Sequence, residues 1–159
     1  MDKLIVSTDT LELNPELAGI LRVKGQRKRE SKRPIFNGSV MGSENEEQAA
    51  LFQWRDMVAG VLPELAMLHA IPNGQYRSGQ RMEPGLMAGI PDICLPFPSQ
   101  GWHGFYGELK VGNNTTSSEQ DAVIRNLRNN GYFVVVKYGW VAMAKSLLDY
   151  LQRTDITID

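Results

Sequence analysis

Three short apolar runs constrain the fold of this chain more than any other feature. They are Ile90–Leu95, Phe105–Val111 and Phe133–Val136, and each is too short for a buried helix. Short apolar runs bounded by glycine, proline and polar residues are typical of β-strands. The first two flank the turn-rich segment Pro96–Gly101, so we expect them to pair as a hairpin. The third run is apolar throughout, which predicts a central place in the sheet.

Helical patterns alternate with these strands. Ser43 has a glutamate three residues later, a capping box that predicts the start of a helix. A second helix is expected from the polar segment 113–118 through about Asn129, with Gly131 as its left-handed cap. The last helix is expected over about Trp140–Arg153. The order helix, strand, strand, helix, strand, helix predicts an α/β fold, a small mixed β-sheet flanked by helices.

The charge distribution divides the chain into two parts. Between Arg22 and Arg33 lie seven of the 17 basic residues and one acidic residue, whereas nine basic and thirteen acidic residues follow from Glu44 onward. We expect residues 1–42 to form an N-terminal extension and residues 43–159 to form one domain. The basic segment is interpreted either as a solvated tail or as an arm attracted to a polyanion such as DNA.

Composition excludes several classes of protein. No run of eighteen apolar residues occurs, and the start of the chain lacks a basic and then apolar leader, so neither membrane insertion nor secretion is expected. Cys94 is the only cysteine, which excludes an internal disulfide and a four-cysteine zinc site. We expect Cys94 to be a small buried apolar residue and the protein to be cytoplasmic.

One constellation of residues points to chemistry. Glu108 and Lys110 lie two positions apart in the second predicted strand, so both side chains project to one face. If Asp92 reaches the same edge from the neighbouring strand, the two carboxylates and the Leu109 carbonyl form an oxygen-rich site. Such a site suits Mg²⁺ or Mn²⁺. A divalent cation beside an ammonium group is the machinery expected for phosphodiester hydrolysis.

A structural reading of the same residues stays open at this point. In that reading Glu108 and Lys110 are a solvated strand pair, and Asp92 is a turn residue after a proline. Against it, Asp92 and Glu108 both lie within strongly apolar segments, where an unneutralised carboxylate is costly.

A series of motifs in fixed order adds a resemblance. The motifs are Glu44-x3-Gln48, Ala70-Ile71-Pro72-Asn73-Gly74-x2-Arg77, Gly85-Leu86-Met87-Ala88-Gly89-Ile90-Pro91-Asp92-Ile93, Gly107-Glu108-Leu109-Lys110, Ser117-x2-Gln120 and Gly131-Tyr132-x-Val134-Val135-Val136-x-Tyr138-Gly139-Trp140. Over roughly residues 43–151 this series resembles the VRR-NUC family of the PD-(D/E)xK nuclease superfamily. It is similar to the stand-alone members found in phages.

The resemblance implies a restriction-endonuclease-like core and metal-dependent cleavage of DNA with Mg²⁺ or Mn²⁺. Asp92, Glu108 and the Leu109 carbonyl match the metal-binding positions of the family, and Lys110 matches its catalytic lysine. Glu44 matches a further metal ligand. The remaining matches are the supporting active-site residues Gln48 and Gln120.

The resemblance also implies partners. Stand-alone members form homodimers that cut branched DNA such as Holliday junctions, so we expect a homodimer acting on duplex or branched DNA, in the host cytoplasm if a phage encodes it. Asn73, Arg77 and Arg81 lie in a loop well placed to bind phosphates. Members of the family usually carry a longer and more lysine-rich segment there, so this chain departs from the pattern of DNA contacts.

Two other functions remain alternatives. The first is a non-catalytic DNA-binding module that retains the nuclease fold and binds branched DNA without turnover. The second is a magnesium-dependent hydrolase acting on a small phosphorylated molecule.

Overall fold

A computed structural model describes residues 42–72 and 84–158. The predicted extension up to residue 41, its basic segment, and the loop residues Asn73, Arg77 and Arg81 lie outside the described residues. The elements in chain order are α2 (Glu44–Val58), the 3₁₀ helix η2 (Pro63–Met67), β1 (His69–Ala70), β2 (Ile93–Leu95), β3 (Phe105–Lys110), α3 (Ser118–Asn129), β4 (Phe133–Tyr138) and α4 (Trp140–Tyr150).

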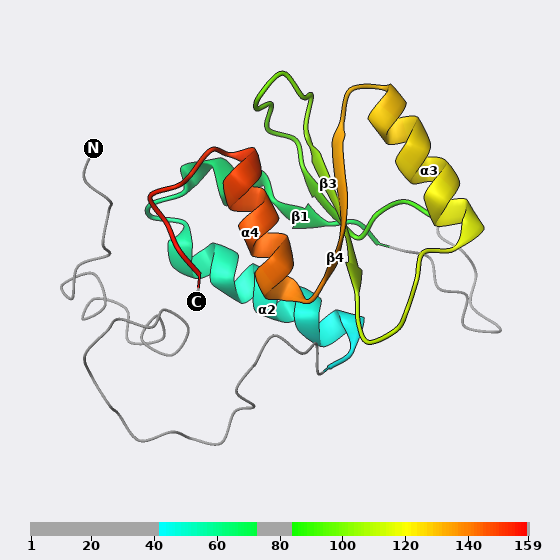
Figure 1. Ribbon diagram of the computed structural model, residues 1–159, viewed down its shortest axis with the longest axis horizontal. Coiled ribbons are helices and arrows are strands. Elements are labelled where there is room, and N and C mark those ends of the chain that lie inside the picture. Colours follow the sequence, from blue (N-terminus) through cyan, green and yellow to red (C-terminus); the bar gives the residue numbers. More distant parts are fainter. Residues whose placement is uncertain (1–41, 73–83, 159) are drawn as a thin grey trace.

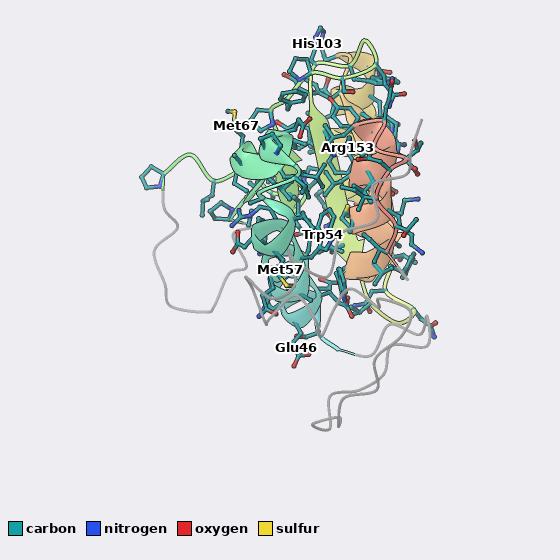
Figure 2. All side chains as sticks on the ribbon, turned by 90° about the vertical axis from the view of Figure 1, so that its left-hand side faces the viewer. Glu46, Trp54, Met57, Met67, His103 and Arg153 are labelled. Carbon is teal, nitrogen blue, oxygen red and sulfur yellow. The ribbon has the colours of Figure 1, made fainter. Side chains whose placement is uncertain are left out.

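The predicted start of α2 is confirmed. The Ser43 N–H donates to Glu46 Oε2 at 2.7 Å, and the Glu46 N–H donates back to Ser43 Oγ at 3.3 Å, which completes the capping box. Trp54 is buried, and Figure 2 shows it in the interior between α2 and α4. The helix is therefore held by its first turn at one end and by its apolar face along its length.

The four strands form one mixed sheet in the order β1-β2-β3-β4. The predicted hairpin is confirmed, because β2 pairs antiparallel with β3 and Ile93 lies opposite Gly107. Strand β2 begins at Ile93 rather than Ile90. The Leu109 N–H donates to the Asp92 side chain, so it is not available for a further backbone hydrogen bond between β2 and β3. The two-residue strand β1, which the sequence did not predict, adds antiparallel to β2.

The predicted central place of the third apolar run is wrong. Strand β4 pairs with β3 in parallel and is the last strand of the sheet among the described residues. Its apolar character has another cause, because α3 and α4 both contact β4. A strand covered on both faces needs apolar residues at every position even when it lies at an edge.

Helices cover both faces of the sheet (Figure 1). Helices α2 and α4 lie on one face and α3 lies on the other. Phe105, Gly107 and Leu109 of β3 face α4 and α2: a Cβ on Gly107 would lie 2.6 Å from Met143 Sδ. The alternate residues Glu108 and Lys110 therefore project toward the side of α3.

The predicted glycine cap at the C-terminus of α3 is confirmed. Gly131 has a φ of 81°, and its N–H donates to the Arg128 carbonyl at 3.1 Å. The Tyr132 N–H donates to the Leu127 carbonyl, also at 3.1 Å, which completes a Schellman motif. The motif turns the chain directly into β4, so the start of α3 lies at the opposite end of the sheet, where β3 ends.

In the part of the chain that the structure describes, no helix combines the length and apolar content needed to cross a membrane.

Candidate active site

The candidate site lies at the carboxyl end of β3. Lys110 Nζ donates to Glu108 Oε1 at 2.6 Å, and both side chains are buried. Gln120 Nε2, from the first turn of α3, donates to the same glutamate oxygen. The solvated strand pair that remained open from the sequence is therefore wrong, because neither Glu108 nor Lys110 is exposed.

Asp92 joins this group through the hairpin. Because β2 and β3 are antiparallel, the residue before β2 lies beside the end of β3. Asp92 Oδ2 accepts the Leu109 N–H at 2.9 Å. The N–H and C=O of one strand residue point to the same side of the strand, so the Leu109 carbonyl also points toward the side of Asp92.

Glu44 reaches the site from the start of α2. Its Oε1 lies 3.9 Å from Lys110 Nζ, and the Asn114 side-chain amide donates to the same oxygen at 3.2 Å. The Tyr138 hydroxyl donates to the Asn114 carbonyl at 2.9 Å. Sequence reasoning missed Asn114, because no local pattern reveals a bond to a residue 70 positions away.

Burial dominates the electrostatics of the site. It raises the pKa of the Glu108 carboxyl, and the charges of Asp92 and Glu44 raise it further, while the bond from Lys110 opposes the shift. Burial alone would lower the pKa of Lys110, but the hydrogen bond to Glu108 and the surrounding carboxylates outweigh it, so that pKa is raised. The site therefore holds excess negative charge around one buried ammonium group.

The two oxygens of Glu108 differ in a way that bears on a cation. Oε1 accepts from Lys110 and Gln120, whereas Oε2 is buried and has no hydrogen-bond partner within residues 42–72 and 84–158. A buried carboxylate oxygen without a partner is costly. A hard divalent cation would satisfy it, so the donor set fits Mg²⁺ or Mn²⁺.

The described side chains do not yet form a complete metal cluster. No group of three or more His, Cys, Asp or Glu side chains in residues 42–72 and 84–158 is arranged to hold an ion. The candidate ligands Asp92, Glu108 and the Leu109 carbonyl include only two such side chains. Glu44, which bonds to Asn114, would have to turn toward Asp92 and Glu108 to add a third carboxylate.

The structure brings together six of the residues that the sequence singled out. They are Glu44, Asp92, Glu108, Leu109, Lys110 and Gln120. Gln48 is half-buried on α2, one turn after Glu44, and takes part in none of the contacts above. Cys94 is buried in β2, and burial raises the pKa of its thiol, which disfavours a nucleophilic role.

Gly89 lies directly against the first turn of α3, which carries Gln120. Its φ is 78°, and a Cβ there would lie 2.7 Å from the carbonyl carbon and oxygen of Glu119, in the first turn of α3. We expect Gly89→Ala to lower the free energy of unfolding by about 2–4 kcal/mol. Because the displaced turn carries Gln120, the bond to Glu108 should also be lost. Chemical denaturation measures the first effect.

Gly85 provides the matched control. Its φ of 92° is equally restrictive, but no atom of the described residues lies within 4 Å of the position of an added Cβ. Gly85→Ala should therefore lose only about 1 kcal/mol, from backbone strain. Equal losses at the two glycines would show that contact with α3 contributes nothing.

Comparison with known proteins bears on the fold. No family model and no curated protein matches the sequence. A solved structure named "VRR_NUC domain protein" is similar, with a TM-score of 0.55 and 22% sequence identity, over 69% of this chain and 88% of that chain. The chain therefore has the VRR-NUC type of fold, which confirms the predicted restriction-endonuclease-like α/β architecture.

Proposed function

We propose that this protein is a nuclease that hydrolyses phosphodiester bonds in DNA with the help of Mg²⁺ or Mn²⁺. The proposal rests on one observation: the two carboxylate oxygens of Glu108 have different surroundings. One of its oxygens is held by Lys110 and Gln120, the other is buried and has no hydrogen-bond partner among the described residues, and the charge of Asp92 acts on the same carboxyl group. The likeness of the fold to a VRR_NUC domain protein supports the same chemistry.

The residues that would hold the cation are Glu108 through Oε2, Asp92, and Leu109 through its carbonyl. Glu44 would complete the set from α2. A bound ion would supply polarisation of a phosphoryl oxygen and would lower the pKa of a water molecule.

Lys110 has a separate role in this proposal. Its ammonium group is buried and is fixed by Glu108, so its position is set before substrate arrives. A fixed positive charge beside the phosphate stabilises the negative charge that develops in the transition state, and it orients the attacking water. Gln120 holds Glu108 in place from α3 and leaves the second carboxylate oxygen free for the cation.

Several finer features of the proposal rest on the sequence. Residues 43–159 would be the nuclease domain, and residues 1–42 an extension whose basic segment binds DNA phosphates. Asn73, Arg77 and Arg81 would add contacts to DNA phosphates. Homodimers would place two sites on one branched substrate such as a Holliday junction.

A panel of DNA substrates tests the proposal. The full chain is incubated with a four-way junction, a flap and plain duplex in Mg²⁺ or Mn²⁺, and cut positions are mapped. We expect cleavage that EDTA and Asp92→Ala both abolish, with paired nicks across the junction if the protein acts as a dimer. No cutting of any substrate, or cutting that survives EDTA, would contradict it.

The panel also distinguishes the competing functions. Binding of the junction without cutting, unaffected by Asp92→Ala, would favour the non-catalytic DNA-binding module. The incomplete metal cluster in the described residues is the observation that keeps this alternative in view. Turnover of nucleotides or sugar phosphates without affinity for DNA would favour the small-molecule hydrolase.

A further inference from the structure

A second buried carboxylate, Glu47, lies outside the proposed chemistry. It is on α2, one turn after Glu44, and the residue is 2% exposed. Its Oε2 accepts the backbone N–H of Trp140 at 2.7 Å. A fully buried acid is rare unless it performs a defined task, because its desolvation is costly.

The partner of Glu47 is the start of α4. This helix begins after Gly139, which has no side chain to cap it, so Glu47 supplies the missing cap from another helix. A carboxylate at this position also interacts favourably with the partial positive charge of the helix N-terminus. The bond therefore fixes α2 against α4 at one point.

That point is directly connected to Lys110. The Gly139 N–H donates to the Lys110 carbonyl at 3.2 Å, so the turn that Glu47 holds is bonded to the residue that carries the ammonium group. On the other side, Glu44 lies three residues before Glu47 on α2, so the bond that Glu47 makes fixes the same helical turn that carries Glu44. Glu47 therefore links the first turn of α2, which carries Glu44, to the Gly139–Trp140 turn, which is bonded to Lys110.

We propose that Glu47 is a positioning residue, which holds Glu44 at its distance from Lys110 by fixing α2 to the start of α4. The inference rests on the proposed nuclease function, because it concerns the geometry of that site. Glu47 would touch neither substrate nor cation. Its effect on catalysis would pass through the distance between Glu44 and Lys110, and this distinguishes it from a residue that merely stabilises the fold.

A double-mutant cycle on the full chain tests the inference. The proteins are wild type, Glu47→Ala, Glu44→Gln and the double variant, compared by kcat for DNA cleavage and by Mn²⁺ affinity, at a temperature where circular dichroism shows all four folded. We expect Glu47→Ala to lower kcat about tenfold in the wild-type background and less than about twofold in the Glu44→Gln background. Equal fold losses in both backgrounds would overturn the inference.

Two further variants keep the test decisive. If Glu47→Ala does not fold, Glu47→Asp retracts the carboxylate by about 1.5 Å and takes its place in the cycle. Arg153→Met is the control for stability alone. It removes bonds to Val61, Glu64 and Asp155 at a part of the molecule remote from the start of α2 (Figure 2), and it should leave kcat unchanged.

Failure of the proposed function has a different signature. A wild-type chain that neither cleaves DNA nor binds Mn²⁺ would remove the proposed function, and this inference with it. A wild-type chain that cleaves DNA, combined with equal losses in the cycle, would contradict the inference alone.

Discussion

Glu108→Gln should abolish metal-dependent cleavage of DNA, with a loss on the order of 10³-fold in kcat. Glutamine has the same shape, and its oxygen can still accept from Lys110 and Gln120, so the fold should persist. The variant lacks the charge and the second acceptor oxygen that the cation requires. Single-turnover cleavage of the preferred substrate from the panel measures the loss.

Asp149→Asn is the matched control for this change. Asp149 is an exposed carboxylate on α4, so its neutralisation alters the net charge by the same amount and should leave cleavage unchanged. Glu108→Gln with near wild-type activity would mean that this glutamate is structural and that cleavage occurs elsewhere.

Lys110→Met should lower both the stability of the protein and kcat, and we expect Mn²⁺ to restore only the stability. Methionine keeps much of the apolar stem but leaves the buried Glu108 carboxylate without its cationic partner. We expect the metal-free variant to lose about 3 kcal/mol in the free energy of unfolding, the cost of breaking a buried pair. Saturating Mn²⁺ should restore most of that stability, because the ion replaces the lost positive charge.

Catalysis by the same variant should not recover. With Mn²⁺ bound, kcat should remain about 10²- to 10³-fold below wild type, because an ion held at Glu108 Oε2 would not occupy the place of the ammonium group, which is bonded to Oε1. Thermal unfolding and cleavage, both measured as a function of Mn²⁺, separate the two effects. Lys145→Met, at an exposed lysine of α4, is the control. Recovery of both stability and kcat would contradict a catalytic role for Lys110.

The convergence of the site was predictable from the sequence for a simple reason. Two apolar runs joined by a short turn must pair antiparallel, so the beginning of the first strand meets the end of the second. Alternation along β3 then places Glu108 and Lys110 on one face. The capping box at Ser43 likewise located the start of α2, and with it Glu44.

Other features could not be predicted, because they arise from contacts distant in sequence. The apolar run of β4 indicated burial on both faces, but burial by helices does not determine whether a strand is central. Strand β1 has only two residues and therefore no periodicity to recognise. Glu47 is one of three acidic residues in the first turn of α2, and only its bond to Trp140, 93 positions away, distinguishes it.

Titration of Mn²⁺ into the full chain by calorimetry tests whether Asp92 and Glu108 bind a divalent cation, and it requires no knowledge of the preferred DNA. We expect saturable binding to the wild-type protein that Asp92→Ala and Glu108→Gln each eliminate, while Asp149→Asn binds as wild type does. Binding that is undiminished in both site variants, or no binding to the wild-type chain at all, would contradict the proposed cation site.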